Sequence, residues 1–270
     1  MHHNFAQRWN EASDRHAEDG RWGHDSDDRL AFPLRPSIHR GQSIVQIQRN
    51  VHPGRYTNGR ASPGGFDYEI ANGEFTIFDQ YLLAIAAASH SIYIENQALP
   101  IPPIAAALEE ALKRGVEIVI LVPARPEEHV REARRNPDRR LLFDQVTRLD
   151  LYERFALVGI AALNPQGERR DIYVHAKVML VDDVWATIGS CNLHTNSLSG
   201  HTEMNASISD PAVVRPLRCA LLAEHLGLTT AHLDARATLQ LYRSIAQEND
   251  AEDPAWQGIA YRLDAAAYGE

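Results

Sequence analysis

The sequence predicts an α/β fold in which a mixed, mostly parallel sheet is flanked by helices. From residue 43 onward, short apolar or alternating segments take turns with segments whose apolar residues recur at helical spacing. The run 116–123 is apolar almost throughout, which is typical of a strand covered on both faces. Hydrophobic residues make up 44% of the 270-residue chain, so a sizeable core can form.

Each expected element has a local signal. Residues 43–51 alternate between apolar and polar side chains, and the Gly- and Pro-rich residues 52–67 that follow predict a loop. Gly115 and Gly227 stand where a glycine commonly ends a helix. The expected strands are 43–51, 91–96, 116–123, 155–164, 173–181 and 184–189. The expected helices are 75–88, 104–114, 127–150, 213–227 and 233–247, with a turn at 165–171.

Composition restricts the classes of function. The formal net charge is −9, whereas a protein that binds mainly nucleic acid usually has a basic surface, so no nucleic-acid partner is expected. Cys191 and Cys219 fit neither a zinc-binding spacing nor a disulfide framework. The chain has no long apolar run, and its first residues lack the apolar centre of a signal peptide. Neither a transmembrane helix nor a signal peptide is expected.

The densest chemistry lies in residues 171–205. On a strand, residues two apart share a face, so His175 and Lys177 are expected to point the same way. A turn at Asp182 and a return strand would bring Ser190 and Asn192 back to the same end of the sheet. This combination predicts a site for a phosphate ester.

Each side chain has a chemical reason to be there. An imidazole can attack phosphorus or protonate a leaving oxygen, and the Lys177 ammonium would bind the non-bridging phosphate oxygens. Ser190 and Asn192 would add neutral hydrogen-bond donors to the same oxygens. Glu203 is expected to accept from the second ring nitrogen of His175.

Other candidates are weaker. Asp182 lies at the turn, on the wrong face for attack, so a structural role is the better interpretation of this motif position. His194, His201 and Glu203 could be read as zinc ligands, but their spacing is poor and no cysteine joins them. Five arginines in the expected helix 127–150 suggest either a phosphate-binding patch or, more simply, a solvated helix face: Arg131, Arg134, Arg135, Arg139 and Arg140.

The spacing His175-x-Lys177-x4-Asp182-x6-Gly189-Ser190-x-Asn192 matches the HKD signature of the phospholipase D superfamily. The segments 92–97 (IYIENQ), 111–123 and 223–228 (AEHLGL) resemble the C-terminal lobe of bacterial phospholipases D and cardiolipin synthase-like proteins. The resemblance spans roughly residues 43–230. It implies a phospholipase D-like lobe with His175, Lys177 and Asp182 as catalytic-motif residues and a possible pocket at Glu95, Asn96 and Gln97.

Members of this superfamily usually have two HKD motifs, and the printed sequence contains one. The resemblance implies that one histidine attacks phosphorus while another protonates the leaving alcohol, so a second motif would come from a homodimer mate or a missing lobe. Residues 3–10 resemble the last helix of such a preceding lobe. The implied organisation is a remnant and linker at 1–40, the HKD lobe at 41–235 and a helical tail at 236–270.

The expected function is therefore hydrolysis of a phosphodiester or phosphatidyl transfer on phospholipids. It would need no metal or other cofactor and would take place in the cytoplasm or at a membrane surface that is contacted transiently. Two alternatives stay open: a catalytically inactive half-protein that acts as an interaction module, and a nuclease of the same superfamily.

Overall fold

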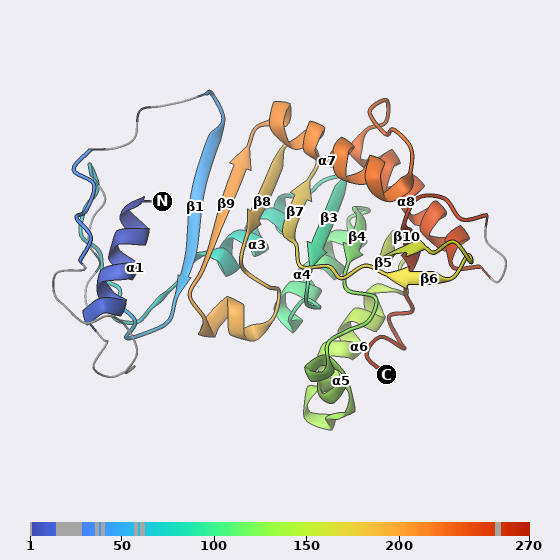
Figure 1. Cartoon of the computed structure of the whole chain (residues 1–270), viewed down its shortest axis with the longest axis horizontal. Helices are drawn as coiled ribbons and strands as arrows, with labels where there is room; N and C mark the ends of the chain where they lie inside the picture. The colour runs from blue at the N-terminus through green and yellow to red at the C-terminus, as the bar shows by residue number, and fades with distance from the viewer. Residues whose placement is uncertain are drawn as a thin grey trace.

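The computed structural model describes residues 2–14, 29–35, 38, 41–56, 59, 63–251 and 255–270. These residues form a ten-stranded mixed sheet with the order β10-β5-β4-β3-β7-β8-β9-β1-β2, and β6 pairs with β5 (Figure 1). The linker expected within residues 1–40 lies largely outside the described residues. The α/β class and the mixed sheet flanked by helices are confirmed.

The strands have the following bounds: β1 Ile44–Val51, β2 Glu74–Phe75, β3 Ser91–Asn96, β4 Glu117–Leu121, β5 Phe155–Leu163, β6 Arg169–Asp171, β7 Lys177–Val181, β8 Trp185–Gly189, β9 Glu203–Ser209 and β10 Ala260–Arg262. The helices are α1 His2–Asp14, α3 Thr76–Ala87, α4 Pro102–Lys113, α5 Glu128–Arg135, α6 Arg140–Leu149, α7 Pro211–Leu226 and α8 Ala235–Asn249. Two short helical turns complete the set, η2 Pro137–Arg139 and the π-helical η3 Asn196–Gly200.

The expectation of a mostly parallel sheet is wrong. Only β3–β4 and β4–β5 pair in parallel, and the other described pairs are antiparallel. Parallel neighbours need a long crossover, which α4 and then α5–α6 provide. The connection between β7 and β8 is too short for a crossover, so these two strands pair as antiparallel neighbours. Strand β9 then pairs with β8, also in the antiparallel sense.

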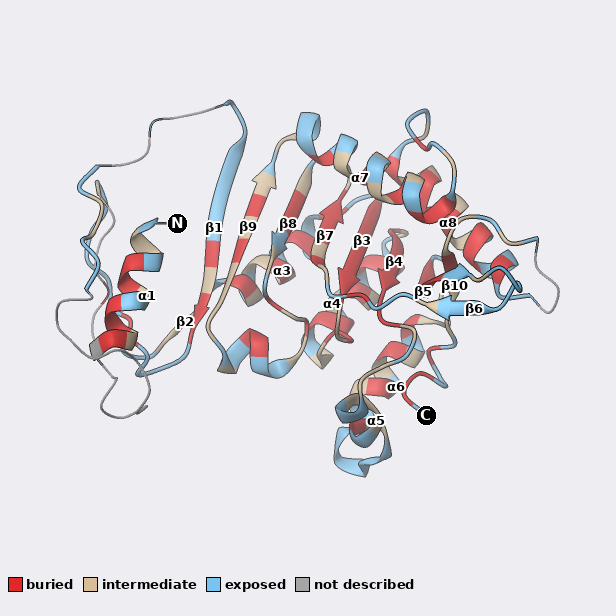
Figure 2. Ribbon diagram, in the orientation of Figure 1, coloured by how far each residue is buried: buried red, intermediate tan, exposed pale blue. Residues whose placement is uncertain are grey.

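Helices cover both faces of the sheet. On one face, α3, α4 and α6 bury Ile85, Leu108 and Val146 against the apolar side chains of β3, β4 and β5. On the other face, α7 and α8 bury Leu222 and Tyr242 against the same strands. As Figure 2 shows, β3 and β4 are buried along their length, whereas the first half of β1 is exposed. The rigid centre of the sheet therefore includes β3, one of the strands that build the candidate site.

The C-terminal part of the chain belongs to this sheet. The helix expected near 233–247 is confirmed as α8, but β10 was not predicted, and it pairs with β5. The N-terminal α1 includes residues 3–10, which were expected to be helical from their resemblance to the last helix of a preceding lobe, and it stands beyond the β1 edge (Figure 1). Within the described residues, no helix combines the length and apolar character needed to cross a membrane.

Candidate phosphate-ester site

Four strand ends meet at one edge of the sheet and build the candidate site. The C-terminal ends of β3 and β8 lie beside the N-terminal ends of β7 and β9, because neighbouring strands here are antiparallel. The register places Asn96 opposite Lys177 and Gly189 opposite Asn205. Residues separated by more than 100 positions therefore converge at a single edge, as the predicted return strand requires.

Lys177 is the buried cation of the site, with only 6% of its surface exposed. Its Nζ donates to Oε1 of Gln97 at 2.9 Å and to the backbone oxygen of His175 at 2.8 Å. Burial lowers the pKa of the Lys177 ammonium, and the nearby carboxylates of Glu203 and Glu127 partly oppose this effect. The ammonium is thus desolvated, a state in which a charged ligand interacts strongly with it.

Ser190 and Asn192 lie on the turn that leaves β8. Asn192 Nδ2 donates to the same Gln97 oxygen that Lys177 contacts, at 3.4 Å. Ser190 Oγ donates to Glu203 Oε2 at 2.5 Å, and the Ser190 amide donates to the Met204 oxygen at 3.1 Å. The structure therefore brings the predicted donors Lys177 and Asn192 to one place, whereas the Ser190 hydroxyl donates to Glu203.

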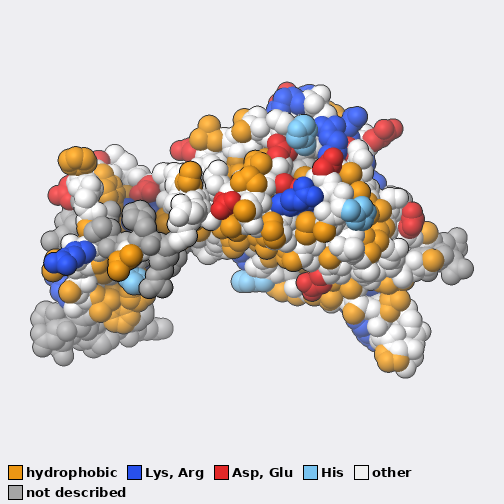
Figure 3. All heavy atoms as spheres, turned by 90° about the horizontal axis from the view of Figure 1, so that it is seen from above, with side chains coloured by type: hydrophobic (Ala, Val, Ile, Leu, Met, Phe, Trp, Pro, Cys, Tyr) orange, Lys and Arg blue, Asp and Glu red, His pale blue; other side chains and the backbone are white. Residues whose placement is uncertain are grey.

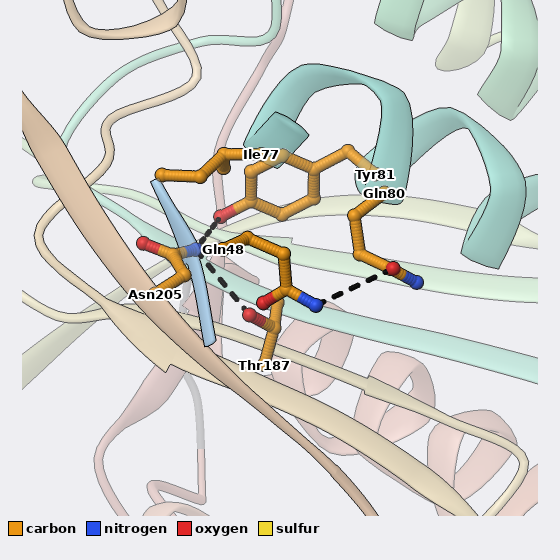
Figure 4. A pocket seen from close by; sticks show the side chains of 6 residues that line it. All are labelled: Gln48, Ile77, Gln80, Tyr81, Thr187 and Asn205. Atoms are coloured by element: carbon orange, nitrogen blue, oxygen red, sulfur yellow. Dashed lines mark hydrogen bonds between the residues drawn. The ribbon is translucent and has the colours of Figure 1, made fainter. Parts of the chain in front are cut away.

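A polar cluster behind this turn was missed at the sequence level. Asn205 Oδ1 accepts from the Cys191 amide at 3.3 Å, while its Nδ2 donates to Tyr81 and to Thr187 at 3.3 Å each. Figure 4 shows Asn205, Thr187 and Gln48 directed toward Tyr81 and its neighbours on α3. A Cβ at Gly189 would lie 2.1 Å from Asn205 Oδ1, so only glycine fits there. The available sequence signal for this cluster was the presence of amide side chains, such as Gln48 and Asn205, at alternating positions of segments that form strands.

His175 is exposed and precedes the first hydrogen-bonded residue of β7, so the expected strand 173–181 begins four residues later than predicted. Its ring stacks on Tyr173, with ring centroids 6.2 Å apart and planes inclined by 23°. The Tyr173 hydroxyl donates to Oε1 of Glu127, and Gln97 Nε2 donates to the same oxygen at 2.6 Å. The imidazole is thus exposed to solvent next to Tyr173, which bonds to Glu127 and Gln97.

Glu127 is the carboxylate on the His175 side of the site. Hydrogen bonds from Tyr173 and then from Gln97 lower the pKa of Glu127, and the His129 and His175 rings act in the same direction. Alternation could have identified Tyr173, which lies two residues before His175, but no sequence signal indicates that Glu127 is close to it.

The expected Glu203–His175 hydrogen bond is absent from the described part of the chain. Glu203 instead accepts from Ser190 Oγ, which lies on the turn across from the histidine. The physical reason is the register: Gly189 pairs with Asn205, so the turn that starts at Ser190 faces the beginning of β9. Glu203 therefore fixes the Ser190 hydroxyl within this chain.

Asp182 lies at the far end of β7, roughly 15 Å along the strand from Lys177 at about 3.3 Å per residue. Its Oδ1 accepts from the amides of His90 and Ser91 at 2.9 and 2.7 Å, and its Oδ2 accepts from the Ser89 amide at 2.7 Å. Its backbone has a positive φ of 53°, which suits a tight turn. Asp182 thus anchors the start of β3, in agreement with its structural interpretation, and it does not contribute a reactive group to the site.

Of the three residues predicted as a possible pocket, only Gln97 faces Lys177. Asn96 Oδ1 accepts from the amides of Ala98 and Leu193 at 3.0 and 3.1 Å, which fixes the loop after β3. Glu95 points to the opposite face of the sheet, where it accepts from Tyr93 at 2.9 Å.

Glu95 belongs to a separate buried cluster under α7 and α8. His225 Nδ1 lies 3.1 Å from the Tyr93 hydroxyl and 3.2 Å from that of Tyr242. Burial lowers the pKa of His225 to about 4 and raises the pKa of Glu95. This cluster is a stabilising polar network of the core and supplies no group to the Lys177 site.

The remaining candidates do not join the site. Among the described residues, no three His, Cys, Asp or Glu side chains are grouped as metal ligands. The arginines of α5 and α6 form ion pairs, for example Arg135 with Glu128 at 3.4 Å and Arg140 with Asp144 at 3.8 Å. On the face seen in Figure 3, acidic and basic side chains are interspersed, so this face has no continuous basic patch.

Comparison with known proteins places these features in a family. A family model described as "Cardiolipin synthase, PLD-like domain" matches residues 81–223, which is more than half of the chain. The matched region contains all four strand ends that build the site, those of β3, β7, β8 and β9.

Curated relatives match over parts of their length. Phospholipase D B of Dictyostelium discoideum is 26% identical over 274 aligned positions, which cover 81% of this chain and 22% of that protein. Cardiolipin synthase B of Salmonella typhi is 30% identical over 141 positions, which cover 51% of this chain and 30% of that protein. The chain thus spans less than a third of the length of either relative.

Among solved structures, a phospholipase D family member, Nuc from Salmonella typhimurium, is 20% identical and has a TM-score of 0.42. That match covers 66% of this chain and 90% of the solved chain. NucT from Helicobacter pylori is 19% identical with a TM-score of 0.41, and the match covers 53% of this chain and 83% of that one.

Proposed function

This chain belongs to the family of cardiolipin synthase PLD-like domains, and from that premise we propose that it provides one half of a site that cleaves or transfers a phosphodiester of phospholipids. His175 is the reacting imidazole. Lys177, Ser190 and Asn192 bind the non-bridging phosphate oxygens.

The observation that carries this proposal is the convergence of two donors on one point. Lys177 Nζ and Asn192 Nδ2 both donate to a single oxygen, that of Gln97, beside the exposed His175. Donors fixed around one oxygen position, one of them a desolvated cation, stabilise the charge that develops on a phosphoryl oxygen. The same arrangement serves hydrolysis and transfer, since the two reactions differ only in the final acceptor.

The proposed reaction needs a second imidazole. One histidine attacks phosphorus and forms a phosphohistidine as the bond to the leaving oxygen breaks; the other donates its proton to that oxygen. The second histidine then removes a proton from water or an alcohol, which attacks phosphorus and breaks the bond to nitrogen. Because the printed sequence contains one HKD motif, we propose that the other histidine comes from a partner copy or from another lobe. If the second motif comes from another lobe, His175 would be the general acid and base. In a symmetric dimer, one copy's His175 would attack phosphorus and the other copy's would protonate the leaving oxygen.

Phospholipid is the proposed substrate class, at a membrane surface that the protein contacts transiently. The net charge of −9 is unfavourable for binding a polyanion such as nucleic acid. The relatives named phospholipase D and cardiolipin synthase support the same class.

The test is turnover on vesicles of phosphatidylcholine and phosphatidylglycerol, with and without an added alcohol, and with single-stranded DNA as a second substrate. We expect lipid turnover that His175→Ala reduces by about 10³-fold. His232→Ala, which changes an exposed histidine remote from the site, is the matched control and should retain full turnover.

Sedimentation of the same samples tests the paired histidine. Turnover by a strict monomer of this chain would contradict the need for a second motif. Equal lipid turnover by wild type and His175→Ala would remove any role for His175, and cleavage of DNA without lipid turnover would favour the nuclease alternative.

A further inference from the structure

One side chain occupies the point on which the proposed phosphate-binding donors converge. The Gln97 carboxamide oxygen accepts from Lys177 Nζ at 2.9 Å and from Asn192 Nδ2 at 3.4 Å. With the two donors oriented as they are, a ligand oxygen that accepted from both would lie where Gln97 Oε1 lies now. Gln97 and such a ligand therefore compete for one position.

The orientation of the Gln97 amide follows from its other end. Nε2 donates to Glu127 Oε1 at 2.6 Å and to the Tyr173 hydroxyl at 2.7 Å. A carboxylate accepts and cannot donate when ionised, and Glu127 has a lowered pKa. The amide nitrogen must therefore face Glu127, and its oxygen must face the ammonium.

The contacts also leave this arrangement open to exchange. Gln97 follows the last residue of β3 and is only half-buried, so its side chain can move without disturbing the ladder. On the other side of the contact, Asn192 Oδ1 is buried and has no hydrogen-bond partner among the described residues. A neutral amide oxygen is a weaker acceptor for an ammonium than a charged phosphoryl oxygen is.

We propose that Gln97 determines specificity at this site. Its amide oxygen keeps the position between Lys177 and Asn192 when the ligand is neutral, and an anionic phosphodiester displaces it. This inference rests on the proposed function and adds a role for Gln97 to it. Gln97 gives up its bond to Lys177 when a phosphoryl oxygen takes its place. Glu127 then keeps its bond from Tyr173, the residue on which His175 stacks.

Binding of inorganic phosphate, measured by calorimetry on the intact chain, tests the competition without requiring turnover. We expect Gln97→Ala to bind phosphate several-fold more tightly than wild type, since the competitor is removed. Gln97→Glu should bind it at least tenfold more weakly, because its carboxylate pairs with Lys177. Gln240→Ala is the matched control: the Gln240 amide also donates to a glutamate, Glu117, and its removal should leave phosphate binding unchanged.

The outcomes separate the two proposals. Weaker or unchanged phosphate binding by Gln97→Ala, with normal binding by wild type, would overturn the competition and make Gln97 a ligand of the phosphate or a bystander. Absence of phosphate binding from both wild type and Gln97→Ala would overturn the proposed phosphate site itself. Where turnover is measurable, Gln97→Ala should also reduce the ratio of the turnover rate on a phosphodiester to that on its neutral methyl triester. An unchanged ratio would contradict the specificity role.

Discussion

The two ends of β7 carry residues of one short motif but differ in every physical respect. At one end, Lys177 is buried, donates to side-chain and backbone oxygens and lies beside the exposed His175. At the other end, the oxygens of Asp182 accept from three consecutive backbone amides. Side-chain partners can exchange for a ligand, whereas a carboxylate bonded to three amides is part of the architecture. One sequence motif can therefore contain both residues proposed to react and residues that stabilise the fold.

A large effect on turnover is expected at this end of β7 from Lys177→Met, which preserves the length of the side chain and removes its charge. Turnover should fall by about 10²- to 10³-fold, as is usual when a donor to a developing oxyanion is lost. The thermal midpoint should not fall, because burial already disfavours the ammonium and lowers its pKa. Turnover rates and calorimetry on the same preparation check both statements, and a large loss of stability would show that Lys177 belongs with the anchoring residues instead.

The pH dependence of stability provides the next effect, from the buried His225. Burial holds its pKa at about 4, against 6.5 in an unfolded chain. Between these values the unfolded chain binds more protons, so stability is complete above pH 6.5 and decreases as the pH falls toward 4, by about 3 kcal/mol.

Denaturant titrations of wild type and His225→Phe between pH 4 and 7 give the free energy of unfolding at each pH. The contribution of His225 is the difference between the two proteins in the slope of this free energy against pH. Turnover at pH 7 should be almost unchanged in the variant, because His225 lies in the last turn of α7, packed against Tyr93 and Tyr242, and makes no described contact with the Lys177 site. Equal slopes would show that His225 is protonated in the folded chain as readily as in the unfolded one.

Of these substitutions, that of Asn205 should have the smallest effect, and it should lower both stability and turnover. It is buried in the core, yet it holds the Cys191 amide of the turn that carries Ser190 and Asn192. Asn205→Ala should cost about 2 kcal/mol of stability, since it leaves three polar groups without partners, and should lower turnover by about tenfold.

Ser207→Ala is the matched control for Asn205→Ala, because Ser207 is buried on the same face of β9 and bonds to Gln48 at 3.0 Å. It should reduce stability without reducing turnover. Equal turnover for the two variants would mean that the turn keeps its geometry without Asn205.

Much of this arrangement could be predicted from the sequence, and the limits have physical causes. Alternation and helical spacing are local, so β1, β3, α3 and α8 were located nearly to the residue, whereas the expected strand at His175 begins only at Lys177. Strand order is not local: the β3–β4–β5 crossovers made the sheet look mostly parallel, although its other half is antiparallel. Strand β9 was not predicted, although its apolar residues Met204, Ala206 and Ile208 alternate with polar ones.

The same distinction explains the site. The Lys177–Ser190–Asn192 grouping was predictable because a hairpin links its members within 16 positions. Glu127 could not be found in this way, since it reaches the site from the loop before α5. The partner of Glu203 was predicted wrongly because the register that faces it toward Ser190 is a property of the assembled sheet.

The most direct test of the account compares His175→Ala with Asp182→Ala in one assay, with turnover per folded molecule and stability measured for both. We expect His175→Ala to lose about 10³-fold of the turnover with an unchanged thermal midpoint. We expect Asp182→Ala to lose about 3 kcal/mol of stability while its folded fraction retains turnover within about threefold. A stable Asp182→Ala protein without turnover, or a His175→Ala protein that turns over normally, would contradict the assignment of chemistry to one end of β7 and anchoring to the other.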